Sequence, residues 1–110
     1  MTDTCCTTLD AQRLRHAVSA VYGRVAKDPN GDFRFHHGPD YAVRLLGYDR
    51  QALDGLPDGA TAAFAGVGNP HAIAPIHVGE TVLDVGCGAG MDLLLAAKHV
   101  GPSGRLSAWR

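Results

Sequence analysis

The chain has no long apolar run, no excess of charge of one sign and few cysteines. None of its apolar stretches approaches the roughly 20 residues that a transmembrane helix needs, and its N-terminus lacks the apolar core of a signal peptide. The 110 residues carry a formal net charge of −1, with charges dispersed along the chain, so nothing indicates a nucleic-acid or membrane surface. We therefore expect a cytoplasmic protein with neither kind of partner.

Only three cysteines are present, an odd number that argues against a disulfide framework. Cys5 and Cys6 are adjacent in a threonine-rich stretch, residues 1–8, that we expect to be a flexible N-terminal arm. Cys87 has no base beside it in the sequence, so a small buried apolar role is a simpler interpretation than a nucleophile. Six histidines are present without the spacing of metal ligands, and we expect no metal site.

Helical periodicity dominates the first quarter of the chain. A helix is predicted from a cap at Thr7 or Thr8 to about Lys27, and the turn-forming residues 28–31 end it. Its apolar side chains recur on one face: Leu14, Ala17, Val18, Val21, Tyr22 and Val25.

Short helical turns follow, after a connector at residues 33–38 that has extended character at 33–35. We predict helical segments at 41–46, 50–53, 60–64 and 71–74. Gly47 ends the first of them, and Asp49 caps the second, whose Leu53 faces inward with Leu56. Asn69 caps the last one, with Pro70 at its first position.

A strand, a glycine-rich turn and a helix follow one another near the C-terminus. Residues 82–85 are an apolar run that suits a fully buried parallel strand, interrupted only by Asp84. Glycines then occupy alternate positions, 86, 88 and 90, before a helix predicted over 91–100 and a second strand from 105 to 109. This order predicts one right-handed parallel crossover whose loop approaches a nucleotide cofactor. Met91 stands where a dinucleotide fingerprint has its third glycine, so the loop is of another kind.

The segment Val82-Leu-Asp-Val-Gly-Cys-Gly-Ala-Gly90 resembles motif I of class I S-adenosylmethionine-dependent methyltransferases. Its flanks, roughly from residue 40 to residue 106, are similar to the arsenite methyltransferase group. The resemblance implies an α/β fold, in which N-terminal helices precede the first β-α-β unit of a Rossmann-like methyltransferase fold with an incomplete sheet. Residues 9–79 would then be a helical cap region, and residues 80–110 the start of the domain that binds S-adenosylmethionine.

The same resemblance implies which residues contact the cofactor. Asp84, at the carboxyl end of the first strand, would hold the positively charged methionine end. Asp92 either complements the helix dipole or also reaches the site, and Tyr22 either covers the pocket or packs in the core. No catalytic residue can be named, because in-line methyl transfer needs little beyond positioning. The expected cofactor-binding residues are Asp84, Gly86, Cys87, Gly88, Gly90 and Asp92.

Two positions depart from the pattern of the group. Val67 stands where arsenite methyltransferases have a cysteine that binds trivalent arsenic, which argues against arsenite as the substrate. Arg110 stands where an acidic residue binds the ribose hydroxyls, and a guanidinium cannot accept their hydrogen bonds. We therefore expect a gene fragment or a frameshift after about Leu106.

The leading hypothesis is a methyltransferase of small-molecule acceptors, represented by its N-terminal part. One alternative is a non-enzymatic vestigial or binding fragment, either inert or docking onto a full-length relative through its open sheet edge. The same open edge would also allow the chain to associate with itself. A second alternative is an arsenite methyltransferase or an As(III)-binding protein that uses Cys5 and Cys6, since thiolates suit soft ions.

Overall fold

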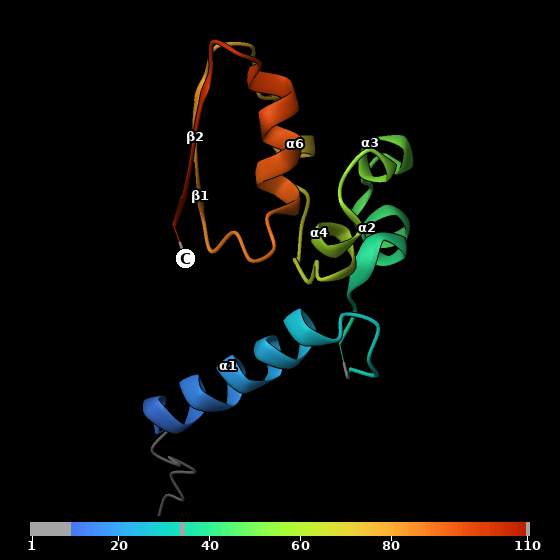
Figure 1. Cartoon of the computed structure of the whole chain (residues 1–110), viewed down its shortest axis with the longest axis vertical. Coiled ribbons are helices and arrows are strands. Elements are labelled where there is room, and N and C mark those ends of the chain that lie inside the picture. The colour runs from blue at the N-terminus through green and yellow to red at the C-terminus, as the bar shows by residue number, and fades with distance from the viewer. Residues whose placement is uncertain (1–9, 34, 110) are drawn as a thin grey trace, which may run out of the picture.

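The computed structural model describes residues 10–33 and 35–109, which form a helical region followed by a β-α-β unit (Figure 1). The elements, in chain order, are α1 (Ala11–Lys27), α2 (Gly38–Leu46), α3 (Arg50–Asp54), α4 (Asp58–Ala62), α5 (Pro70–Ile73), β1 (Thr81–Val85), α6 (Met91–Val100) and β2 (Arg105–Trp109). The expected mixture of helix and strand is confirmed. None of the described helices is long and apolar enough to cross a membrane. The expectations for residues 1–8, with Cys5 and Cys6, and for Arg110 lie outside the described residues.

Helix α1 ends at Lys27 as predicted, but a different residue caps its start. The Asp10 carboxylate accepts hydrogen bonds from the backbone N–H groups of Gln12 (3.0 Å) and Arg13 (3.2 Å). The prediction of a cap at Thr7 or Thr8 is therefore wrong, because the helix begins at Ala11 and Asp10 satisfies two of the free donors of its first turn.

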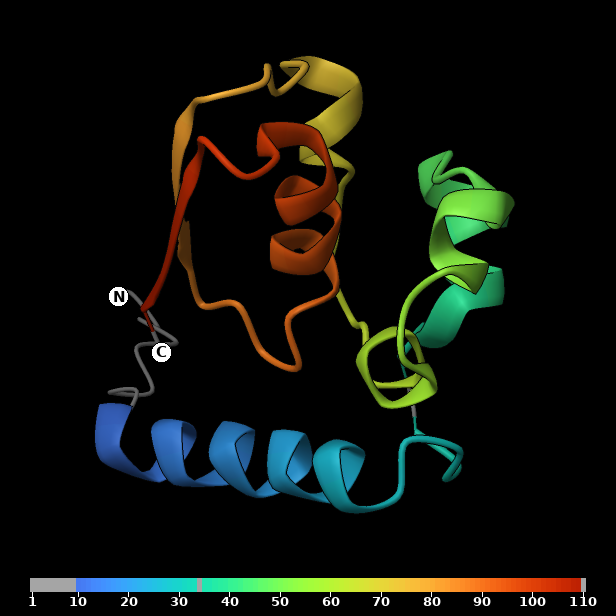
Figure 2. The same cartoon turned by 45° about the horizontal axis from the view of Figure 1, so that its top comes forward.

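The apolar face of α1 is mostly exposed. Val25 is the one buried residue of the helix, whereas Leu14, Val18 and Tyr22 are 46%, 45% and 55% exposed. The helix runs along one end of the molecule, beneath the loop that joins β1 to α6 (Figure 2). In the described residues, α1 therefore borders the rest of the protein through its C-terminal half.

Helices α3 and α5 have the predicted N-caps, and α2 ends as predicted. Asp49 and Asn69 cap α3 and α5 through their side chains, and Gly47 ends α2 with a φ of 74°. Helices α2 and α4 begin two or three residues earlier than predicted, α2 because Pro39 lies in its first turn. No strand forms at the connector residues Phe33 and Phe35.

One apolar core joins this helical region to α6. Leu53 and Leu56 point inward as predicted, at 2% and 7% exposure. The core consists of Ala42, Tyr48, Leu53, Leu56, Phe64, Met91 and Leu95. Because Met91 and Leu95 come from α6, the core fixes the N-terminal end of that helix against the segments around α2 and α4.

The two strands pair in parallel, with Thr81 opposite Arg105 and Val85 opposite Trp109. This confirms the predicted strand, helix and strand. The expectation of a fully buried first strand is wrong, because Leu83 is 57% and Val85 72% exposed. Successive side chains of a strand point to opposite faces. In the described residues only one face is covered, by α6 (Figure 1).

Candidate functional site

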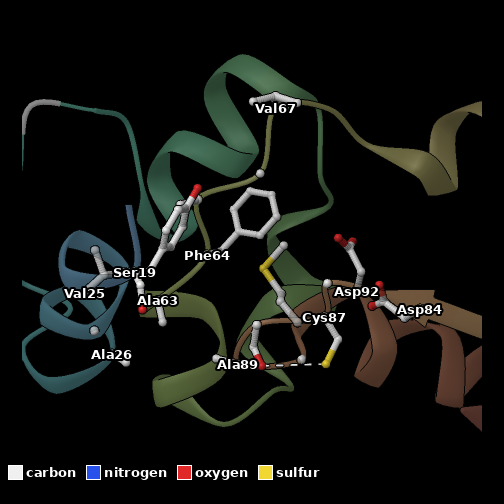
Figure 3. Close-up of a pocket in the computed structure, with 18 residues that line it drawn as sticks. Ser19, Val25, Ala26, Ala63, Phe64, Val67, Asp84, Cys87, Ala89 and Asp92 are labelled. Atoms are coloured by element: carbon white, nitrogen blue, oxygen red, sulfur yellow. Dashed lines mark hydrogen bonds between the residues drawn. The ribbon is translucent and has the colours of Figure 1, made fainter. Parts of the chain in front are cut away.

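A cleft with a volume of about 1130 Å³ opens between three segments of the chain: the C-terminal half of α1, residues 63–67 and the glycine loop at 86–90 (Figure 3). The structure brings all six expected cofactor-binding residues to its wall: Asp84, Gly86, Cys87, Gly88, Gly90 and Asp92. Five of them come from the loop and the helix start that follow β1, and Asp84 is the penultimate residue of β1. A cleft of this size accommodates a nucleotide-sized ligand.

The glycine loop depends on backbone conformations that other residues rarely adopt. Gly86, Gly88 and Gly90 have φ angles of 73°, 57° and 91°, and no described residue other than glycine has a positive φ. A Cβ atom built on any of the three would meet no protein atom within 4 Å. The loop therefore needs glycine for its path, and the space beside it is left open for a ligand.

Two carboxylates lie together at the end of β1 and the start of α6 (Figure 3). Burial, and then the negative charge of Asp92, raise the pKa of the Asp84 carboxyl, while the nearby His71 opposes the rise. A positively charged ligand group would stabilise both ionised carboxylates. The arrangement therefore suits a cation.

Asp92 is held by side chains that sequence reasoning did not identify. The Tyr48 hydroxyl donates a hydrogen bond of 2.6 Å to Asp92 Oδ1, and His71 Nε2 lies 3.1 Å from the same oxygen. Burial, followed by the hydrogen bond to Asp92, raises the pKa of Tyr48 well above its ordinary value, so the hydroxyl stays protonated. Tyr48 is 44 residues from Asp92. The available signal was a tyrosine directly after the helix-ending Gly47.

The other residues that the sequence analysis singled out lie in the cleft or at its rim. Cys87 is half-buried, and its thiol contacts the Gly88 carbonyl oxygen at 3.8 Å. Tyr22 lines the cleft at 55% exposure, so the alternative that it packs in the core is wrong. Val67 lies at the rim and is 96% exposed (Figure 3). Within residues 10–33 and 35–109, no three histidine, cysteine or acidic side chains gather as a metal site would require.

The fold and the cleft together define a mixed α/β protein with a ligand-sized site at the glycine-rich turn of a β-α-β unit. Its sequence is 51% identical to an arsenite methyltransferase of Halobacterium salinarum over 61 residues, which are 56% of this chain and 15% of the relative. The resemblance to S-adenosylmethionine-dependent methyltransferases of the arsenite methyltransferase type is thus confirmed, over a small part of the relative's length. No protein-family model matches the chain, and no solved structure does.

Proposed function

We propose that this chain binds S-adenosylmethionine in the cleft and contributes that site to a methyltransferase of small-molecule acceptors. The observation that carries the proposal is the convergence of the six expected residues on one cleft. The 51% identity to an arsenite methyltransferase supports it. In this proposal the β-α-β unit is the first unit of a Rossmann-like fold, residues 80–110 begin the cofactor domain, and residues 9–79 are its helical cap.

The residues of the cleft fit the chemistry of this cofactor. When bound, S-adenosylmethionine supplies an electrophilic methyl group on a positively charged sulfur. The open backbone at Gly86, Gly88 and Gly90 accepts close approach of the ligand. Asp84 and Asp92 provide negative charge for its ammonium and sulfonium groups. Tyr22, on α1, lines the same cleft.

Val67 bears on the identity of the acceptor. It presents an aliphatic side chain at the rim, and an aliphatic group cannot coordinate arsenic. We therefore favour a small-molecule acceptor other than As(III). Arsenite remains the second candidate because the relative is an arsenite methyltransferase and because the thiol of Cys87 lines the same cleft.

Calorimetric titration of the chain with S-adenosylmethionine and with S-adenosylhomocysteine tests the proposal. We expect one site, and an Asp84→Asn variant should bind S-adenosylmethionine about 10- to 100-fold more weakly, since a hydrogen bond to a charged group contributes about 1.5–3 kcal/mol. Asp54→Asn, which changes an exposed carboxylate at the end of α3, is the matched control and should bind like the wild type. A folded chain that binds neither ligand would overturn the proposal.

A further inference from the structure

The Asp92 carboxylate is held from one side only. Every hydrogen bond that the described residues make to it, from Tyr48 and from His71, ends on Oδ1. The Asp92 side chain is 29% exposed, and it lines the cleft beside Asp84 (Figure 3). The arrangement fixes one carboxylate oxygen within the protein and leaves the other for a ligand.

Tyr48 reaches Asp92 from the core. The residue is 5% exposed, and its ring packs edge-on against Phe64, with centroids 5.4 Å apart. The same hydroxyl lies 3.3 Å from the Gly68 carbonyl oxygen, the longer of its two contacts. With its ring fixed by packing and its hydroxyl always protonated, Tyr48 acts as a rigid donor to Asp92.

His71 is directed at Asp92 by the start of α5. The Asn69 side chain accepts a hydrogen bond of 3.1 Å from the His71 backbone N–H, and Pro70 fixes the first helical position. The imidazole side chain is 17% exposed, and its ring packs edge-on against Tyr48 at 6.2 Å. This short helix therefore places a titratable group against the carboxylate.

We propose that Tyr48 and His71 are positioning residues that orient the Asp92 carboxylate toward the cleft, and that protonation of His71 weakens the binding of a cationic ligand there. This inference rests on the proposed function. The charged or titratable groups around His71 are Asp92 and His99 from α6, Asp84 from β1, and Tyr48. A neutral imidazole leaves both carboxylate charges to attract the ligand, whereas an imidazolium offsets one of them.

The test compares two ligands that differ in one charge. S-adenosylmethionine carries a sulfonium, and S-adenosylhomocysteine has a neutral thioether in its place. Between about pH 5 and about pH 8, calorimetry should show the affinity for S-adenosylmethionine rising about tenfold. The affinity for S-adenosylhomocysteine should change less, because its reacting end carries less positive charge.

Matched variants separate positioning from packing. His71→Gln should remove most of the pH dependence, whereas His99→Gln, which changes an exposed ring 6.1 Å away, should retain it. Tyr48→Phe keeps the aromatic ring and should weaken S-adenosylmethionine binding about tenfold. Tyr41→Phe is its control, because it loses a comparable hydrogen bond, 2.8 Å to the Gly66 carbonyl oxygen, without contacting Asp92.

The outcomes distinguish this inference from the proposed function. An unchanged pH dependence in His71→Gln, or equal binding by the two tyrosine variants, would overturn the inference while leaving the cofactor site intact. A wild-type chain that binds neither ligand at any pH would count against the proposed function. In that case, ¹⁵N NMR of the imidazole tests the network alone: we expect a hydrogen on His71 Nε2 that responds to Asp92→Asn. A tautomer with hydrogen only on Nδ1, insensitive to that substitution, would overturn the network.

Discussion

Asp84 carries a carboxylate at a position where burial and the charge of Asp92 both disfavour ionisation. His71 opposes this rise in the pKa of Asp84, and it also contacts Asp92. Perturbed acids of this kind gather at functional sites, because a ligand later supplies the charge that the protein lacks. The same residues that prepare the cleft for a cation therefore reduce the stability of the unliganded chain.

Replacing Asp84 with asparagine should stabilise the unliganded protein at neutral pH. Its pKa is raised in the folded state, so its contribution to stability is fully present below the unfolded-state pKa of about 3.9 and is lost as the pH rises through the folded-state pKa. Asp84→Asn avoids that loss. Urea unfolding should show a larger free energy of unfolding for the variant at neutral pH, and an advantage that shrinks as the pH falls through the folded-state pKa and is lost below about 3.9. A variant less stable than the wild type at neutral pH would contradict this account.

Gly→Ala substitutions at Gly90 and Gly59 form a matched pair that measures how much a side chain in the glycine loop reduces stability. A Cβ atom at either position would meet no atom within 4 Å, but Gly90 has a φ of 91°, whereas Gly59 is helical. Gly90→Ala should cost about 1–2 kcal/mol through the left-handed conformation alone. Gly59→Ala should stabilise by about 0.4–1 kcal/mol by reducing the entropy of the unfolded chain. Thermal unfolding of both variants measures the difference in stability. Equal effects would show that the positive φ of Gly90 does not determine the cost of adding a side chain there.

At the scale of elements, the sequence predicts what is determined locally. Helix α6 has its predicted bounds, and the caps of α3 and α5 are the predicted Asp49 and Asn69, because a cap depends on residues two or three positions apart. Long-range features were not predictable in this way. The exposure of Leu83 depends on what covers the second face of the sheet, and the contact of Tyr48 with Asp92 depends on how α6 packs against the helical region.

Gly104, in the turn between α6 and β2, permits these two elements to pack closely. A Cβ atom there would collide with Val100 Cβ and would lie 2.6 Å from Val100 Cγ2 and 2.9 Å from the Glu80 carbonyl oxygen. Gly104→Ala should therefore destabilise the β-α-β unit by about 1–3 kcal/mol through overpacking. Gly68→Ala, where the added Cβ meets nothing within 4 Å, should change the free energy of unfolding by less than about 0.5 kcal/mol.

A double-mutant cycle identifies the cause of that destabilisation. Val100→Ala removes the Cγ2 contact while keeping Val100 Cβ, so its effect combined with Gly104→Ala should be smaller than the sum of the two single effects. Urea unfolding of the four proteins gives the coupling energy. Additive effects would place the cost in the contacts with Val100 Cβ and the Glu80 carbonyl oxygen instead.

At the scale of the whole molecule, apolar surface remains open on two sides. The described residues extend over 60 × 29 × 23 Å, and α1 exposes Leu14 and Val18 along its length. On the uncovered face of the sheet, Val85 is 72% and Trp109 68% exposed, and the two are register neighbours on adjacent strands. Clusters of this kind, next to strand edges that no described strand pairs, favour association with another chain.

Self-association through this sheet is one of the alternatives that the sequence leaves open, and Trp109 can report it because the chain has one tryptophan. As the concentration rises, we expect a larger sedimentation coefficient together with a shift of Trp109 emission to shorter wavelength, since burial removes the indole from water. Val85→Lys places a charge beside Trp109 and should suppress both changes. Ile73→Lys alters a residue of α5 that is 84% exposed and should preserve them. If the wild type remains monomeric with constant emission across the range, the sheet is not an association surface, and the exposed pair of Val85 and Trp109 needs another explanation.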